Sequence, residues 1–346
     1  MKSKKQIFPF GSISVKVEQK DKSPKKVFVL GSQAESVYAH LLDDKGKVKA
    51  MAVPVASEPF PFWNGEGASQ FFQNISIPSE FEKLTPVNIK YNGRIGKSVD
   101  NWFLKPLGYK REDVWFCYLQ PYARINPGKL KNLEKDYSPF SKGGHFPECT
   151  IPVFNPSEFH NKSRIQEIIS ELEQSQAQTI ILIGEIPVKH FISHFSNYKS
   201  LSDFGNTILN YGKIHIIKIN GKAYRVMALT HPGTDEEFRT GEYIWKKCHK
   251  YWYGKNRLIE AEIILKGKDP TFVDKKPTIC PICYCRKIAK YEVERPPLSQ
   301  KAKRDIREGR LILKKEISPY DPKYICTECE FEFYDKKVEP KFQLAQ

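Results

Sequence analysis

Two C-x-x-C pairs are the residues of this sequence whose type and spacing specify chemistry most directly. They read Cys280-Pro-Ile-Cys283 and Cys326-Thr-Glu-Cys329, with 42 residues between them. Four thiolates in two close pairs form the tetrahedral ligand set that zinc takes in structural sites. We therefore expect these four cysteines to bind one structural zinc ion.

The other thiols leave one alternative open. Cys285 lies near enough in sequence to replace Cys283 as a ligand, whereas Cys117, Cys149 and Cys248 are expected to be buried or free. Disulfides are disfavoured because the chain shows no secretion signal, and paired cysteines in a reducing cytoplasm indicate metal. We accordingly expect a cytoplasmic protein.

The positions of the two pairs also indicate the extent of the module that contains them. We expect residues 266–346 to form a small zinc-ribbon-like module, with a hairpin or helix between the pairs. Its stretch 301–315 is basic and partly helical in pattern, so it could either contact phosphates or be a solvated helix. Because four thiolates fill every zinc position, no position is open for water, which disfavours a zinc-dependent nuclease or deaminase.

A second set of polar residues follows four short apolar runs. The runs are KVFVLG (26–31), VWFCYLQP (114–121), TIILIG (179–184) and AYRVMALTHPG (223–233). Such runs are typical of buried parallel strands, and residues 164–178 have apolar positions at helical spacing. The sequence therefore predicts an α/β domain over residues 26–265: a three-layer α/β/α core around a central, mainly parallel four-stranded sheet.

The loops after these strands are the places to look for a site, because open α/β sheets bind ligands at the carboxyl ends of their strands. The loops read GSQAES, QPYARIN, GEIPVKH and HPGT. Neither G-x-G-x-x-G after the first strand nor G-x-x-x-x-G-K-[ST] occurs, so we expect no nucleotide cofactor.

In this order the loops resemble the motif layout of the uracil-DNA glycosylase superfamily, over roughly residues 26–260. Residues 31–36, GSQAES, correspond to that family's water-activating motif, and His231-Pro232-Gly233 corresponds to its motif for the sugar and leaving base. The segment EPFPFWNG (58–65) resembles the aromatic segment that stacks on a flipped base. The resemblance implies a monofunctional DNA glycosylase that extrudes a base and hydrolyses its N-glycosidic bond.

The resemblance also implies roles for individual residues. The expected catalytic residues are His231, Gln33, Glu35 and Glu58. The expected base-binding residues are Phe62, Trp63, Gln120 and Tyr122. Each has an ordinary structural alternative: core packing for the aromatic rings, and a solvated or capping position in a loop for the polar side chains.

The first loop departs from the family pattern, since Gln33 and Ala34 stand where an acidic or amide residue and a proline are usual. An amide cannot act as a general base, so a shifted base, Glu35 or Glu58, or a different target base is expected. The small Ala34 and Ser36 leave space for a bulky 5-substituted pyrimidine. Modified bases of phage DNA, in antiviral defence, are therefore one expected substrate class, and ordinary uracil repair is the alternative.

Charge favours a nucleic-acid partner. The formal net charge is +16, from 56 Lys and Arg against 40 Asp and Glu, and phosphate neutralisation draws such proteins to DNA. The same charge could merely aid solubility. A non-catalytic DNA-binding protein that keeps the glycosylase fold is a further alternative. We expect no membrane contact, and we expect residues 1–25 to be a basic tail or an added edge segment.

Overall fold

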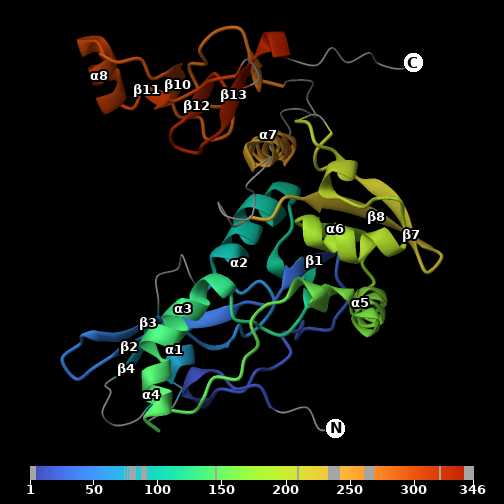
Figure 1. Ribbon diagram of the computed structural model, residues 1–346. Coiled ribbons are helices and arrows are strands. Elements are labelled where there is room, and N and C mark those ends of the chain that lie inside the picture. The colour runs from blue at the N-terminus through green and yellow to red at the C-terminus, as the bar shows by residue number, and fades with distance from the viewer. Residues whose placement is uncertain are drawn as a thin grey trace. The chain divides into compact units, whose positions relative to one another are not determined.

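The computed structural model describes residues 5–73, 75, 77, 83–86, 92–144, 146–208, 210–232, 242–260, 269–318 and 321–338 (Figure 1). The chain forms two compact units. Unit 1 comprises Met1–Asn101, Lys110–Phe204 and Lys213–Glu237, and unit 2 comprises Trp102–Tyr109, Gly205–Gly212 and Phe238–Gln346. The division differs from the predicted boundary at residue 265, because unit 2 takes a helix and two short segments from within the predicted α/β domain.

Within the described residues, the central sheet of unit 1 has five strands in the order β5-β1-β6-β8-β7. They are β1 Val27–Gln33, β5 Val114–Gln120, β6 Thr179–Ile183, β7 His215–Ile219 and β8 Lys222–Leu229 (Figure 1). Strands β5, β1, β6 and β8 run parallel, whereas β7 runs antiparallel to β8. The four predicted parallel strands are confirmed, and β7 is an edge strand that the sequence pattern did not predict.

Helix α5, Lys162–Ser175, covers one face of this sheet and confirms the helix expected near residues 164–178. It begins where the Asn161 side chain accepts hydrogen bonds from the first-turn amides. Its Arg164 donates to the backbone oxygen of Tyr118 and to Cys117 Sγ at 3.1 Å. The guanidinium is buried and paired with Glu171 at 2.9 Å, so it fixes α5 against β5.

A second sheet in unit 1 is antiparallel and was not predicted. It has the order β3-β2-β4 and consists of β2 Ser36–Leu42, β3 Val48–Ser57 and β4 Lys83–Pro86. Strands β2 and β3 form a hairpin, so the chain folds back directly after β1 instead of entering a crossover helix.

This hairpin corrects the prediction for the first loop. Gly31, Ser32 and Gln33 belong to β1, and Ser36 begins β2. Only Ala34 and Glu35 connect the two strands. The supposed six-residue loop is therefore mostly strand, because Gly31–Gln33 pair along β5 as the preceding residues do.

The predicted N-terminal tail is, over its described residues, part of the fold of unit 1. Phe8, Phe10 and Val17 are buried, and Phe8 and Phe10 join the apolar cluster that also contains β2 and β3 residues. The Phe10 amide donates to the Tyr137 hydroxyl at 3.1 Å. The apolar side chains between the lysines are thus buried in unit 1, although the segment as a whole is basic.

The remaining helices are short. They are α1 Ala68–Gln73, α2 Arg94–Ser98, α3 Pro127–Asp136, α4 Ser138–Lys142 and α6 Glu185–His190. Single turns are η1 Pro9–Gly11, η2 Val99–Leu104, η3 Lys105–Leu107, η4 Arg111–Asp113, η5 Pro156–His160, η6 Ile192–His194, η7 Leu201–Phe204 and η8 Lys336–Val338.

Unit 2 contains a mixed sheet in the order β11-β10-β12-β13-β9. Its elements are α7 Glu242–Glu260, β9 Phe272–Val273, β10 Ile288–Val293, α8 Gln300–Arg307, β11 Leu311–Lys314, β12 Tyr324–Cys326 and β13 Glu332–Asp335 (Figure 1). Helix α8 and the two parallel strands β10 and β11 therefore lie between the two cysteine pairs, where a hairpin or a helix was expected.

His249 of α7 ties the two short segments into unit 2. Its Nδ1 accepts from the Tyr211 hydroxyl at 2.8 Å, and its Nε2 lies 3.2 Å from the backbone oxygen of Trp102. Burial lowers the pKa of His249 to about 4, so the ring is neutral near pH 7. A neutral imidazole can make both hydrogen bonds, so His249 links Tyr211 and Trp102 to α7 within unit 2.

Among the described helices, none combines the length and the apolar character that crossing a bilayer requires.

Candidate functional site

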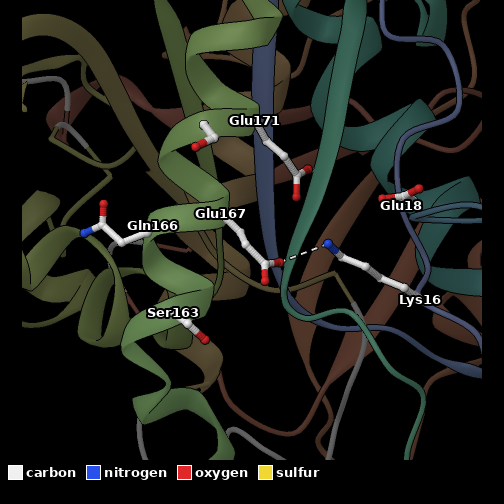
Figure 2. A pocket seen from close by; sticks show the side chains of 7 residues that line it. Lys16, Glu18, Ser163, Gln166, Glu167 and Glu171 are labelled. Carbon is white, nitrogen blue, oxygen red and sulfur yellow. Dashed lines mark hydrogen bonds and ion pairs between the residues drawn. The ribbon is translucent and has the colours of Figure 1, made fainter.

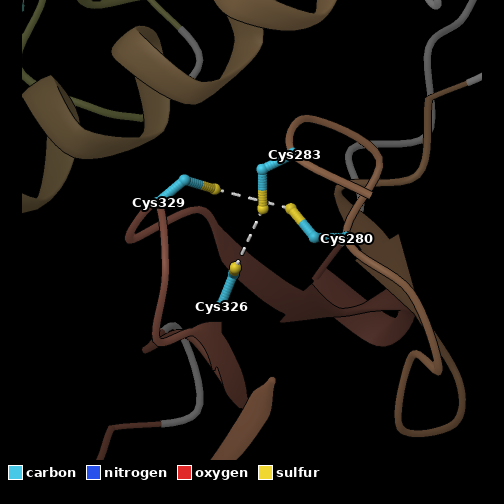
Figure 3. Close-up of side chains that lie close together, drawn as sticks. All are labelled: Cys280, Cys283, Cys326 and Cys329. Atoms are coloured by element: carbon cyan, nitrogen blue, oxygen red, sulfur yellow. Dashed lines mark hydrogen bonds between the residues drawn. The ribbon is translucent and has the colours of Figure 1, made fainter. Parts of the chain in front are cut away.

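The four predicted zinc ligands converge in unit 2 (Figure 3). The Sγ atoms of Cys280, Cys283, Cys326 and Cys329 all lie within 4.8 Å of one another. The Cys280–Cys329 and Cys283–Cys326 sulfur pairs are each 3.5 Å apart. A disulfide would require about 2.05 Å, whereas a tetrahedron with metal–sulfur bonds of about 2.3 Å has edges of about 3.8 Å. The cluster therefore fits a single tetrahedral metal ion.

The two pairs present their thiols through equivalent turns. The Tyr284 amide donates to the Cys280 oxygen at 3.0 Å, and the Glu330 amide donates to the Cys326 oxygen at 2.8 Å. Both Tyr284 and Glu330 have a left-handed backbone, with φ of 57° and 60°. This conformation costs about 1–2 kcal/mol for a residue other than glycine, so the fold holds both turns in a shape that aims the thiols inward.

Cys285 remains a possible alternative ligand, since its Sγ lies 3.3 Å from that of Cys326. Of the other thiols, Cys117 and Cys248 are buried, as expected, and Cys149 is partly buried.

The second candidate site lies at the carboxyl edge of the central sheet, in unit 1. Gln33 ends β1 and pairs in register with Gln120, which ends β5. His231 follows β8. Since β6 alone separates β1 from β8 and neighbouring strands lie about 4.8 Å apart, the backbones of Gln33 and His231 are roughly 10 Å apart. The chain passes from β1 to β5 on one side and then to β6 on the other, so the switch point, where such sheets bind ligands, lies between β1 and β6.

Gln33 has an unusual environment at this edge. Its Oε1 is buried and has no hydrogen-bond partner among the described residues. A buried acceptor left unsatisfied costs about 1–3 kcal/mol, and such atoms in native structures call for a functional or solvent explanation. Gln33 Oε1 is therefore available to accept a hydrogen bond from a bound group or water.

His231 lies against Gly184, the residue between β6 and α6. A Cβ atom at Gly184 would lie 3.2 Å from His231 Cβ, and Gly184 has φ 88° and ψ −180°. Burial lowers the pKa of His231 to about 4. The imidazole is thus neutral near pH 7 and carries one N–H donor. The loop beyond Pro232, including Gly233 of the predicted motif, lies outside the described residues.

Substituting Gly184 by alanine should disturb both the backbone and His231. Only glycine readily adopts this backbone conformation, so we expect Gly184→Ala to destabilise unit 1 by about 1–3 kcal/mol and to shift the NMR signals of the His231 ring. Gly221→Ala is the matched control, because Gly221 also has a positive φ but nothing within 4 Å of the added carbon. Equal shifts of the His231 signals in both variants would contradict the proposed contact.

Glu58 and Glu35, predicted as alternative bases, do lie together. Glu58 Oε1 accepts from the Glu35 amide at 3.0 Å, and Glu58 Oε2 accepts from the Trp63 amide at 3.1 Å. Burial, followed by repulsion from Glu35, raises the pKa of Glu58 to about 8. Because both its oxygens receive backbone amides, Glu58 holds the β1–β2 turn and the segment after β3 in place. Its predicted role in orienting water stays untested.

Phe62 and Trp63 are both buried. The Phe62 ring packs 4.8 Å from the Tyr118 ring on the face of β5 opposite α5, and its amide donates to the Tyr118 hydroxyl at 2.7 Å. Trp63 belongs to the apolar cluster of the β2–β3 hairpin, and its Nε1 donates to the Glu66 oxygen at 2.9 Å. Stacking on a base stays a prediction, and it would require the segment to move because the rings now fill the core.

Gln120 and Tyr122 line a pocket of about 420 Å³ at the end of β5. Arg124 and Glu158 also line this pocket, and neither was predicted as a site residue. Glu158 Oε2 accepts from Gln120 Nε2 and from Arg124 Nε, at 2.5 and 2.8 Å. Arg124 stands in the predicted QPYARIN loop and could have been found there, whereas nothing near Glu158 in the sequence indicates this contact.

A second pocket, of about 510 Å³, flanks α5 (Figure 2). Glu167 and Glu171 dominate its wall, but Glu167 pairs with Lys16 at 2.9 Å and Glu171 pairs with Arg164 at 2.9 Å. These carboxylates are already paired with cations, so they leave no unpaired charge that would point to a ligand.

Comparison of the sequence with models of known protein families and with curated proteins found no match.

Proposed function

We propose that the protein is a DNA glycosylase acting at the carboxyl edge of the β5-β1-β6-β8 sheet, with a structural zinc ion in unit 2. The observation that carries the proposal is the row of polar groups at this edge, in which the buried Gln33 Oε1 has no hydrogen-bond partner among the described residues and His231 is neutral. The three-layer core of the uracil-DNA glycosylase superfamily, whose loops this sequence resembles, is part of the proposal.

In the proposed reaction, the bond between the base and C1′ of deoxyribose breaks and its electron pair leaves with the base. A water oxygen forms the new bond to C1′. His231 donates its N–H to the departing base, because a preformed donor stabilises the charge that develops there. Gln33 accepts from the water or the base edge. Glu35 takes the proton of the water, since the Glu58 oxygens already accept two amides.

The non-catalytic alternative has its own support. Gln33 cannot act as a base, and Glu58 and Phe62 are engaged in holding the fold. A protein with these features could bind an extruded base without cleaving it. Formation of abasic sites separates the two functions, because binding alone leaves every N-glycosidic bond intact.

The decisive experiment incubates the protein with duplex and single-stranded DNA and detects abasic sites by alkaline cleavage. The DNA panel contains uracil, natural bases, and hydroxymethylated or glycosylated cytosines. We expect abasic sites with the wild type, and we expect His231→Ala to lower the single-turnover rate by about 100-fold or more. His194→Ala is the control, because His194 is exposed in the turn after α6. Absence of product with every DNA would refute the glycosylase and favour the binder.

The same panel identifies the substrate class. We propose modified pyrimidines, such as those of phage DNA, because Ala34 in the β1–β2 connection and Ser36 at the start of β2 are small residues. Faster release of uracil than of any modified base would instead establish ordinary uracil repair.

A further inference from the structure

The insert between the two cysteine pairs carries an exposed basic helix. Helix α8 packs beside β11 at one edge of the unit 2 sheet (Figure 1). None of its residues is buried, and its apolar side consists of Ala302 and Ile306. Its start is fixed by the Ser299 side chain, which accepts from the Ala302 amide at 3.1 Å. The helix therefore contributes little to the core of unit 2.

Three cations share one face of α8. Arg307 follows Lys303 by four residues and Arg304 by three, so the three side chains project from the same side of the helix. None of them forms an ion pair within the part of the chain that the structure describes. Like charges at this spacing destabilise a helix by about 0.2–0.5 kcal/mol per pair. Among the described residues, neither packing nor ion pairing accounts for the grouping of these three cations on one side of α8.

The nearby acidic residues do not neutralise this face. Asp305 accepts from Arg310 Nε and Nη2 at 3.0 and 2.7 Å, and Glu308 pairs with Arg310 as well. Arg310 thus binds both acids and leaves the face of Lys303, Arg304 and Arg307 positive. We call these three residues the α8 basic face.

We propose that the α8 basic face binds the phosphate backbone of a nucleic acid. A polyphosphate supplies several negative charges along a line, which three cations on one helix side can contact together, releasing counterions. A membrane surface is less suited, because helices that insert into an interface need a broad apolar face with residues such as Trp, Phe or Leu. The inference rests on the proposed function for its choice of DNA, but it does not require base excision.

The test measures binding of labelled duplex DNA, single-stranded DNA and single-stranded RNA by fluorescence anisotropy between 50 and 200 mM salt. We compare the full-length wild type with the triple variant Lys303→Gln, Arg304→Gln, Arg307→Gln. If all three cations contact phosphates of a duplex, the slope of the logarithm of the association constant against the logarithm of the salt concentration should become less negative by up to about 3 in the triple variant. The affinity at 0.1 M salt should fall on the order of 100-fold.

The matched control removes the same charge from paired lysines of unit 2. Lys290, Lys323 and Lys336 pair with Glu292, Asp335 and Asp274, so the variant Lys290→Gln, Lys323→Gln, Lys336→Gln should change the slope much less. Circular dichroism and zinc content establish that both variants remain folded.

Each outcome decides the proposal separately from base excision. A reduced slope in the α8 variant, larger than in the control, supports it even if no abasic sites form. Equal slopes in the two variants overturn it, as does a wild type that binds no nucleic acid. The proposal is also overturned, in favour of a membrane, if the α8 variant loses the wild type's binding to vesicles of phosphatidylserine and phosphatidylcholine but binds DNA as the wild type does. Comparison of the DNA and RNA arms identifies the polymer.

Discussion

Replacing Cys329 by serine should release the metal and unfold the part of unit 2 that contains the cysteine cluster. The substitution removes one of four sulfurs that lie within 4.8 Å of one another. Structural zinc sites in small modules supply about 10–16 kcal/mol of apparent binding free energy, which is also folding free energy. We expect elemental analysis to find one zinc per chain in the wild type and little in Cys329→Ser. Hydrogen exchange should then show loss of protection in β10, β12 and β13.

Two controls sharpen this experiment. Cys149→Ser removes a partly buried thiol from unit 1 and should retain zinc. Cys285→Ser tests the alternative ligand, because Cys285 Sγ lies 3.3 Å from Cys326 Sγ. Zinc lost in Cys285→Ser but kept in Cys283→Ser would reassign the fourth ligand. Iron with visible absorbance in the wild type would replace the zinc assignment with an iron–sulfur cluster.

The second large effect concerns pH and Glu58. Burial and the nearby Glu35 raise the pKa of Glu58 to about 8, from 4.5. Between these values the folded protein holds a proton that the unfolded chain has lost, so stability falls as pH rises. We expect the free energy of unfolding of unit 1 to fall by about 2 kcal/mol between pH 6 and pH 8 from this group alone. Urea denaturation, followed by hydrogen exchange of β1 and β5 amides, measures it.

Variants isolate the contribution of Glu58. Glu58→Gln has no titrating carboxyl and should lose this part of the pH dependence, whatever its stability at one pH. Glu35→Gln removes the repulsion and should move the midpoint to lower pH. Glu66→Gln is the control, because Glu66 is exposed in the same segment. The same slope in Glu58→Gln as in the wild type would show that Glu58 is ionised in the folded protein throughout this range.

Much of the architecture could be predicted from the sequence because its signals are local. Four apolar runs identified the parallel strands β1, β5, β6 and β8, and helical spacing identified α5 to within three residues at either end. The antiparallel β2–β3 hairpin escaped prediction. Its register contains irregularities near Tyr38 and Leu41, which break the alternation by which such strands are usually recognised.

The candidate site in unit 1 could be predicted only in part. Strand ends placed Gln33, Gln120 and His231 at one edge, since the carboxyl ends of parallel strands meet there. Contacts across the fold decided the rest. Glu58 meets the amides of Glu35 and Trp63, and the burial that results sets its pKa. The positions of Glu35 and Glu58 in the sequence do not indicate which of the two carboxylates is buried.

The sequence by itself predicted the four cysteines that lie together in unit 2 and the four parallel strands of the central sheet. Each C-x-x-C turn fixes two thiols locally, whereas the meeting of the two pairs within 4.8 Å depends on the fold of unit 2. Only the tertiary structure decided that Gly31–Gln33 continue a strand, that Phe62 and Trp63 lie in the core, and that Arg310 binds both acids near α8 and leaves one face positive. These outcomes depend on burial and on pairing between side chains, which arise once the segments pack together.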